Sequence, residues 1–286
     1  MKWKKGRRSD NVEDRRGQKV SPGMAVGGGG LGFLVLALLV AVLGGDPTVL
    51  LQQATAPGPS GTSQPSANPG GGNDELADFV SVVLADTEDT WQSLFQAGGS
   101  TYQAPNLVLF SDQVDSACGF AQSAMGPFYC PADQKVYIDL SFYEDLKTRH
   151  QAPGDFAQAY VIAHEVGHHV QNLLGVSGQV HQLKQQVSEV EANQLSVRLE
   201  LQADCFAGVW AHHADKARDI LEAGDVEEAL NAASAIGDDR LQQEARGRVA
   251  PDSFTHGSSA QRVRWFQQGM QTGSVNQCNT FAVDNP

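Results

Sequence analysis

A short run of metal-binding and acid–base side chains lies near the middle of this chain of 286 residues. His164 and His168 stand four positions apart, and Glu165 directly follows the first of them. Residues 155–175 are predicted to form a helix, in which positions four apart lie one turn apart on the same face. Both imidazoles can then reach one metal ion, with Glu165 beside the open position of that ion. The spacing predicts a catalytic zinc site with Glu165 as the general base.

A catalytic zinc ion takes three protein ligands, so a third one must come from elsewhere in the chain. Glu200 and Asp204 are again four residues apart, within a second predicted helix. We expect Glu200 to bind the metal. We expect Asp204 to accept the free ring N–H of His164 or His168, which would fix the orientation of that ring. The acidic residues that compete with Glu200 for the third position are Asp204, Glu189 and Glu191.

The sequence on both sides of the histidine pair is apolar. Residues 160–163 contain no charged side chain, and Val170, Leu173 and Leu174 follow the pair. Burying two histidines and a glutamate in such a helix is costly unless their polar atoms find partners. A bound metal would supply that partner, which favours a metal site over a chance match on an exposed helix.

Of the other histidines, His256 is a candidate for catalysis. It precedes a predicted helix at 258–271 and could donate a hydrogen bond to the oxyanion of a tetrahedral intermediate. The alternative is a loop or capping role, since such loops are common. His169 points about 100° away from His168 on a helix, so we expect it to be structural or solvated.

The domain that holds these residues spans 74–286 and is expected to have an α+β fold that is predominantly helical. Two runs, 106–110 and 135–140, have the β-branched and aromatic content of strands. We expect an extended substrate to pair with 135–140, as peptides pair with an edge strand. The remaining pattern predicts helices at 74–96, 155–175, 180–214, 215–223, 226–235, 238–247 and 258–271.

The residues before this domain differ in composition. Residues 1–23 form a basic head, and the uncharged residues 24–45 are long enough as one helix to cross a membrane. Residues 46–73 are rich in Pro, Gly and Ser and are expected to be a flexible tether. Basic residues before the apolar run predict a single-pass membrane protein with a cytoplasmic N-terminus and an extracytoplasmic catalytic domain. The alternative is a signal peptide cleaved near 54–56.

Charge is distributed unevenly along the chain. The first 20 residues carry eight basic and three acidic side chains, whereas the rest carry 12 basic and 30 acidic ones, a formal charge of −18. Such a field repels phosphate backbones, so we expect no nucleic-acid partner.

The four cysteines form no CxxC pair of the kind that binds structural zinc. In an oxidising compartment they could form two disulfides, which fits export of the domain. They permit three disulfide pairings. Cys118 with Cys130 would close a local loop, which leaves Cys205 to pair with Cys278. The alternative is four buried thiols.

Several blocks of sequence together resemble the neutral zinc metallopeptidase family of bacteria. The resemblance covers residues 7–17, 126–142, 159–171, 200–214 and 254–269. It implies a zincin-like fold. It also implies that His164, His168 and Glu200 are the zinc ligands and that Glu165 is the catalytic base.

These observations predict a membrane-anchored peptidase that holds one zinc ion per chain and hydrolyses peptide bonds with metal-activated water. Its partners would be a peptide or protein substrate and, through residues 24–45, a membrane. Two alternatives are an envelope scaffold or binding protein with a structural zinc site and a zinc hydrolase of a non-peptide amide. Glu165 favours an enzyme, because a structural site has no need of a general base.

Overall fold

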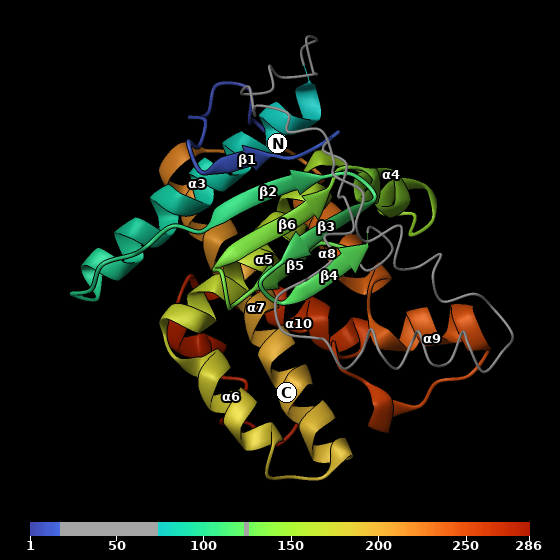
Figure 1. Ribbon diagram of the computed structural model, residues 1–286. Helices are drawn as coiled ribbons and strands as arrows, with labels where there is room; N and C mark the ends of the chain where they lie inside the picture. The colour runs from blue at the N-terminus through green and yellow to red at the C-terminus, as the bar shows by residue number, and fades with distance from the viewer. Residues whose placement is uncertain (18–73, 123–125) are drawn as a thin grey trace, which may run out of the picture. The chain divides into compact units, whose positions relative to one another are not determined.

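The computed structural model describes residues 1–17, 74–122 and 126–286, which belong to one compact unit. This unit is an α+β fold in which helices predominate, as expected from the sequence (Figure 1). A small sheet lies against one side of a layer of helices. The strands are β1 (Val12–Asp14), β2 (Asn106–Phe110), β3 (Gln113–Ser116), β4 (Gly119–Gln122), β5 (Phe128–Cys130) and β6 (Lys135–Asp139). The helices are α3 (Glu75–Ala97), α4 (Ser141–Thr148), α5 (Asp155–Leu173), α6 (Val176–Lys184), α7 (Glu189–Arg218), α8 (Asp225–Ala235), α9 (Asp238–Arg246) and α10 (Ser259–Thr272), with short 3-10 turns η2 (Pro251–Ser253) and η3 (Val275–Cys278).

The four-stranded sheet has the order β1-β2-β6-β5. The first three strands run parallel, and β5 pairs antiparallel with β6 at the edge. Side chains alternate as the pleat requires. In β2, Leu107 and Leu109 belong to the main core beneath the sheet, whereas Val108 and Phe110 point to the other face. The expectation that residues 135–140 form an edge strand for substrate is wrong, because β6 lies between two neighbouring strands and has no free edge.

The outer face of the sheet is covered by the antiparallel hairpin β3–β4. Val114 and Ala121 of the hairpin pack with Phe110 and Tyr137 in a second, smaller core. A disulfide between Cys118 and Cys130 joins the hairpin tip to β5. The sequence had predicted this pairing, and the structure confirms it.

Helix α5 lies at the centre of the helical layer, where it packs against α3, α7 and α8. Helix α10 packs along α7 at very close range. A Cβ atom on Gly269 would overlap the backbone of Cys205, and one on Gly208 would overlap the backbone of Phe266. Only residues without a side chain allow this approach. The second predicted disulfide, Cys205–Cys278, is also confirmed and fastens η3 to α7.

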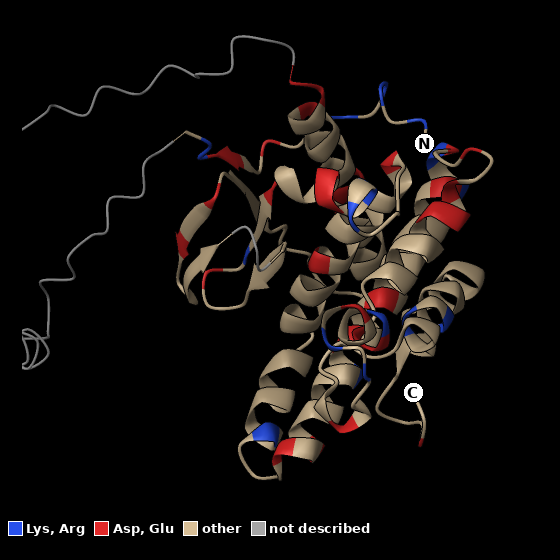
Figure 2. Ribbon diagram, turned by 90° about the vertical axis from the view of Figure 1, so that its right-hand side faces the viewer, with Lys and Arg blue, Asp and Glu red and all other residues tan. Residues whose placement is uncertain are grey.

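The basic head folds onto the domain instead of standing apart from it. β1 pairs with β2, and head arginines form ion pairs with acidic residues that belong mostly to α3. Arg8 binds Asp78 at 2.6 Å, Arg7 binds Glu88 at 2.7 Å, and Arg16 binds Asp74. Figure 2 shows the blue N-terminal segment beside the red acidic residues of the neighbouring helix. These charges, which the sequence suggested were a membrane-orientation signal, are therefore paired within the fold.

The predicted localisation is wrong. A cytoplasmic head cannot lie across a membrane from the domain, since both contribute strands to one sheet. Among the residues that the structure describes, no helix combines the length and apolarity needed to span a bilayer. The predicted membrane helix at 24–45 and the predicted tether at 46–73 both lie outside the described residues.

One predicted helix is divided in two. The sequence pattern indicated a single helix over 180–214, but α6 ends at Lys184 and α7 begins at Glu189. Ser188 caps α7 by accepting the N–H of Glu191, whose carboxylate accepts the N–H of Ser188 in return. This reciprocal capping box satisfies backbone groups that would otherwise lack partners, and so fixes the start of α7.

Candidate metal centre

The predicted metal ligands lie on two helices that touch. α5 carries His164 and His168, and α7 carries Glu200. The helices approach closely at Gly167, where an added Cβ would lie 3.0 Å from the carbonyl oxygen of Ala203. This close contact brings the carboxylate of Glu200 to within 3.2 Å of His164 Nε2 and 3.5 Å of His168 Nε2. The three side chains form a group whose ligand atoms could hold one metal ion.

His164 is held from behind by a buried carboxylate. Its Nδ1 lies 2.8 Å from Oδ1 of Asp204, a residue with no exposed surface. The same carboxylate accepts a hydrogen bond of 2.6 Å from Tyr160 and two hydrogen bonds of 2.9 Å from Arg262. A carboxylate accepts only, so Nδ1 of His164 donates to Asp204, and its Nε2 is the nitrogen that faces Glu200. The predicted proximity of Asp204 to a histidine of the pair is thus present in the structure.

The electrostatics of this cluster keep its carboxylates charged. Burial alone would raise the pKa of Asp204, but Arg262 and His164 outweigh burial and lower this pKa to about 2. Burial also opposes a charge on His164, yet attraction to Asp204 and Glu200 raises the pKa of His164 to about 10. Burial also opposes a charge on Glu200, but the two histidines outweigh it and hold the pKa of Glu200 well below its usual range. A charged carboxylate is the form that binds a cation.

His168 is held from behind by a neutral amide. Its Nδ1 lies 2.9 Å from Oε1 of Gln171, one turn further along α5. The amide nitrogen of Gln171 donates to the carbonyl oxygen of Leu199 at 2.6 Å. Both rings therefore use Nδ1 for support from the protein and keep Nε2 for the space in front of Glu200.

A cleft of about 1180 Å³ opens over these residues. His164, Glu165, His168 and Glu200 all line it, and only 7% of Glu165 is exposed. The cleft walls come from β5 and the end of α4 on one side and from α6, α9 and the loop before α10 on another, all of which contribute lining residues. Glu165 thus faces an accessible space beside the two imidazoles.

His256 also lines this cleft. Its loop is held by Asp238, the first residue of α9. One carboxylate oxygen of Asp238 accepts the backbone N–H groups of Thr255, His256 and Gly257 at 2.7, 2.6 and 3.1 Å. The other lies 3.2 Å from Nδ1 of His256. The hydrogen bond to Asp238 raises the pKa of His256 although burial opposes that shift.

The remaining predicted residues lie away from the group. Glu189 and Glu191 sit in the first turn of α7, where Glu191 serves the capping box, so neither joins the group with His164 and His168. His169 is fully buried and structural. Its Nε2 donates to the carbonyl oxygen of Gln103 at 2.6 Å, and its Nδ1 accepts from the hydroxyl of Tyr129 at 3.0 Å.

Three residues that hold the metal group from behind were not predicted from the sequence. Tyr160 and Gln171 had a local signal, because they stand four residues before His164 and three after His168 on the same helical face. Arg262 had none, since it lies 58 residues from Asp204 in the chain. Only the rule that a buried carboxylate needs a partner could have suggested such a cation.

Residues 1–281 match the model of the family described as "Putative neutral zinc metallopeptidase". The chain belongs to this family. It is 54% identical over 288 residues to the protein named "Uncharacterized protein YpfJ" of Escherichia coli K12, with 98% of this chain and 99% of that protein covered. It is 44% identical over 215 residues to Mb2605 of Mycobacterium bovis and to Rv2575 of Mycobacterium tuberculosis, with 72% of each chain covered. No solved structure matches this member of the metallopeptidase family.

Removing Arg262 should destabilise this metallopeptidase family member strongly. Arg262→Met leaves the carboxylate of Asp204 buried without its cation, and such a loss costs about 3–5 kcal/mol. Urea unfolding followed by circular dichroism would measure the free energy of unfolding. Arg264→Met is the matched control, because Arg264 donates to a backbone carbonyl on the surface and its loss should cost under about 1 kcal/mol. Equal losses for both variants would contradict the importance of the buried pair.

Proposed function

We propose that this protein is a zinc-dependent peptidase that hydrolyses peptide bonds at the cleft over α5 and α7. One observation carries the proposal. The Nε2 atoms of His164 and His168 converge on the carboxylate of Glu200, while both Nδ1 atoms are held from behind. Membership of a metallopeptidase family supports the same reading.

The donor set fits zinc. Two imidazole nitrogens and one carboxylate oxygen are a known catalytic zinc set, which leaves one coordination position open. Hydrogen bonds to the outer nitrogen of each imidazole are the usual support for such ligands. We therefore assign His164, His168 and Glu200 as the ligands and Asp204 as the residue that orients His164. When bound, zinc would act as a Lewis acid that acidifies water and polarises the scissile carbonyl group.

Glu165 is the proposed general base. It follows the first ligand, lines the cleft and is mostly shielded from bulk water. Its carboxylate would take a proton from the attacking water and deliver that proton to the leaving amine. A structural metal site would have no use for a carboxylate in this position.

His256 is the proposed donor to the developing oxyanion. Asp238 fixes its loop through three backbone hydrogen bonds and contacts its Nδ1, which leaves Nε2 for the cleft. A donor that is fixed in advance stabilises charge in the transition state without further reorganisation. Asp238 acts through His256 and is a positioning residue.

The substrate is proposed to lie along β5. This three-residue strand is at the edge of the described sheet, and its residues Phe128 and Tyr129 line the cleft. An extended peptide can add to such an edge through backbone hydrogen bonds. β5 therefore takes the place of the strand that the sequence had suggested.

Replacing Glu165 by Gln should abolish cleavage and leave metal binding intact. The loss in kcat should be about 10²- to 10⁴-fold, because general acid–base catalysis contributes that much. The full chain would be loaded with one equivalent of zinc and incubated with a diverse peptide library, and products would be read by mass spectrometry. Glu189→Gln is the matched control, since this exposed glutamate lies outside the metal group.

Cleavage that survives in Glu165→Gln would contradict the proposed base. If the wild-type chain binds zinc and cuts no peptide, the peptidase assignment fails and a non-peptide substrate or a structural metal takes its place. Zinc bound without His164, His168 and Glu200 would place the metal elsewhere.

The alkaline limit of activity should depend on Asp238. Because Asp238 raises the pKa of His256, the imidazole keeps its proton to a higher pH. It stops acting as a charged donor only when the pH rises above that raised pKa. Asp238→Asn should lower that pKa and move the alkaline limb of the kcat profile to lower pH. Asp252→Asn, a change on the exposed turn η2, should leave the limb in place. A limb that does not move in Asp238→Asn would exclude His256 as the titrating donor.

A further inference from the structure

We infer that Gln171 and Gln202 form an amide relay that positions His168 for the metal, anchored at the Cys205–Cys278 disulfide. The inference rests on the proposed zinc site and adds two positioning residues to it. Neither glutamine contacts the space in front of the ligands. Both lie on the side of His168 that faces away from the cleft, in a line of hydrogen bonds whose donors and acceptors can be assigned.

The relay is a continuous line of side-chain amides. His168 Nδ1 lies 2.9 Å from Gln171 Oε1, and Gln171 Nε2 lies 3.1 Å from Gln202 Oε1. Gln202 Nε2 then donates to the carbonyl oxygen of Cys278 at 3.0 Å. Gln171 has no exposed surface and Gln202 is 7% exposed, so the line runs through the interior.

The far end of the line fixes its direction. A backbone carbonyl oxygen only accepts hydrogen bonds, so Gln202 must present its NH₂ group to Cys278 and its oxygen to Gln171. Gln171 must then present its NH₂ group to Gln202, an orientation that the carbonyl oxygen of Leu199 also requires. The oxygen of Gln171 is left for His168, which can satisfy it only with a proton on Nδ1. Nε2 of His168 is thereby the nitrogen left to give its lone pair to a metal.

The two histidine ligands are thus oriented by different chemistry. His164 is held by the charged Asp204, whose charge is compensated by Arg262. His168 is held by neutral amides, which add no further negative charge beside Glu165 and Glu200. A second buried carboxylate behind His168 would need a second buried cation, because unpaired buried charge is costly.

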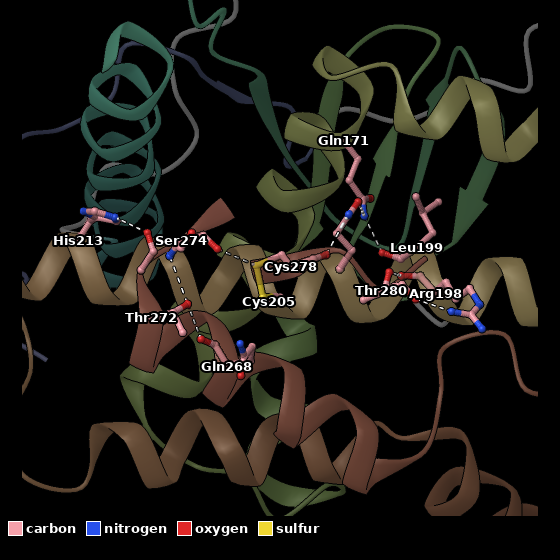
Figure 3. The surroundings of a disulfide bond; sticks show 12 residues. Gln171, Arg198, Leu199, Cys205, His213, Gln268, Thr272, Ser274, Cys278 and Thr280 are labelled. Atoms are coloured by element: carbon pink, nitrogen blue, oxygen red, sulfur yellow. Dashed lines mark hydrogen bonds between the residues drawn. A yellow bond between two sulfur atoms is a disulfide. The ribbon is translucent and has the colours of Figure 1, made fainter. Parts of the chain in front are cut away.

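The C-terminal segment holds the relay in place. Figure 3 shows Gln171 reaching from α5 toward Leu199 on α7, with the Cys205–Cys278 bridge beside them. Beyond the bridge, Thr280 donates to the carbonyl oxygen of Arg198 at 2.6 Å, and Arg198 donates back to the carbonyl oxygen of Thr280. These contacts fix the carbonyl oxygen of Cys278 relative to the part of α7 that carries Glu200.

Zinc affinity of the full chain tests the relay without a substrate. Gln171→Met keeps the length of the side chain and removes both amide groups, and we expect zinc to bind about 10- to 100-fold more weakly. Gln202→Met touches no ligand and should cause a smaller loss, because Leu199 still orients Gln171. Gln186→Met is the matched control, since the amide of Gln186 lies on the surface and bonds to Gln182. Affinity would be measured by competition with a chelator.

Two further readouts separate positioning from loss of structure. The melting temperature of each metal-free variant shows whether it folds, and the visible spectrum of the cobalt-substituted protein reports ligand geometry. We expect the spectrum to change in Gln171→Met and to stay the same in Gln186→Met. Wild-type affinity and spectrum in folded Gln171→Met would overturn the relay, and an effect of Gln171 without any effect of Gln202 would overturn its link to the disulfide. A wild-type chain that binds no zinc would overturn the proposed function together with the relay.

Discussion

The structure depends on the neutralisation of acidic groups in its interior. Glu200 and Asp204 lie close to two histidines at the contact between α5 and α7, and both carboxylates are largely shielded from solvent. Arg262 from α10 is buried to 98% and supplies the one permanent cation that contacts Asp204 among the described residues. Such a group is tolerated only when every charge has a partner. The close packing of α10 on α7 at Gly208 and Gly269 is what brings that arginine to Asp204.

The site is rigid behind and open in front. Behind the proposed ligands, His164 is held by Asp204 and His168 by Gln171. On the open side, the cleft is bounded by short or poorly buried elements. β5 has three residues, and in α9 only Asp238 is buried. The proposed peptidase would need this combination, because ligand geometry must be fixed while a substrate enters and leaves.

The sequence predicted the parts of the site that depend on local spacing. Two histidines one turn apart and a carboxylate pair one turn apart placed His164, His168, Glu200 and Asp204 on helix faces that the structure brings together. Local signals also predicted α3, α5 and α10 within one or two residues. In the structure, Asp74 and Ser258 cap α3 and α10.

What the sequence did not predict depends on contacts between distant segments. The head was predicted to lie on the far side of a membrane, because basic residues before an apolar run usually mark the cytoplasmic end of a membrane helix. Their partners on α3 lie some 70 to 80 positions away in the chain, and a three-residue strand such as β1 has too few residues for a pattern. The central position of β6 depends on β5 and β2, which no spacing in the sequence could reveal. The same holds for Arg262 beside Asp204.

Extended X-ray absorption at the zinc edge, on the full chain loaded with one equivalent of zinc, tests the central claim most directly. We expect a first shell of two imidazole nitrogens and oxygen ligands at about 2.0–2.2 Å, with no sulfur. We expect the imidazole scattering to fall by half in His168→Ala. A shell that contains sulfur at about 2.3 Å, or one without imidazole, would contradict a metal centre built from His164, His168 and Glu200.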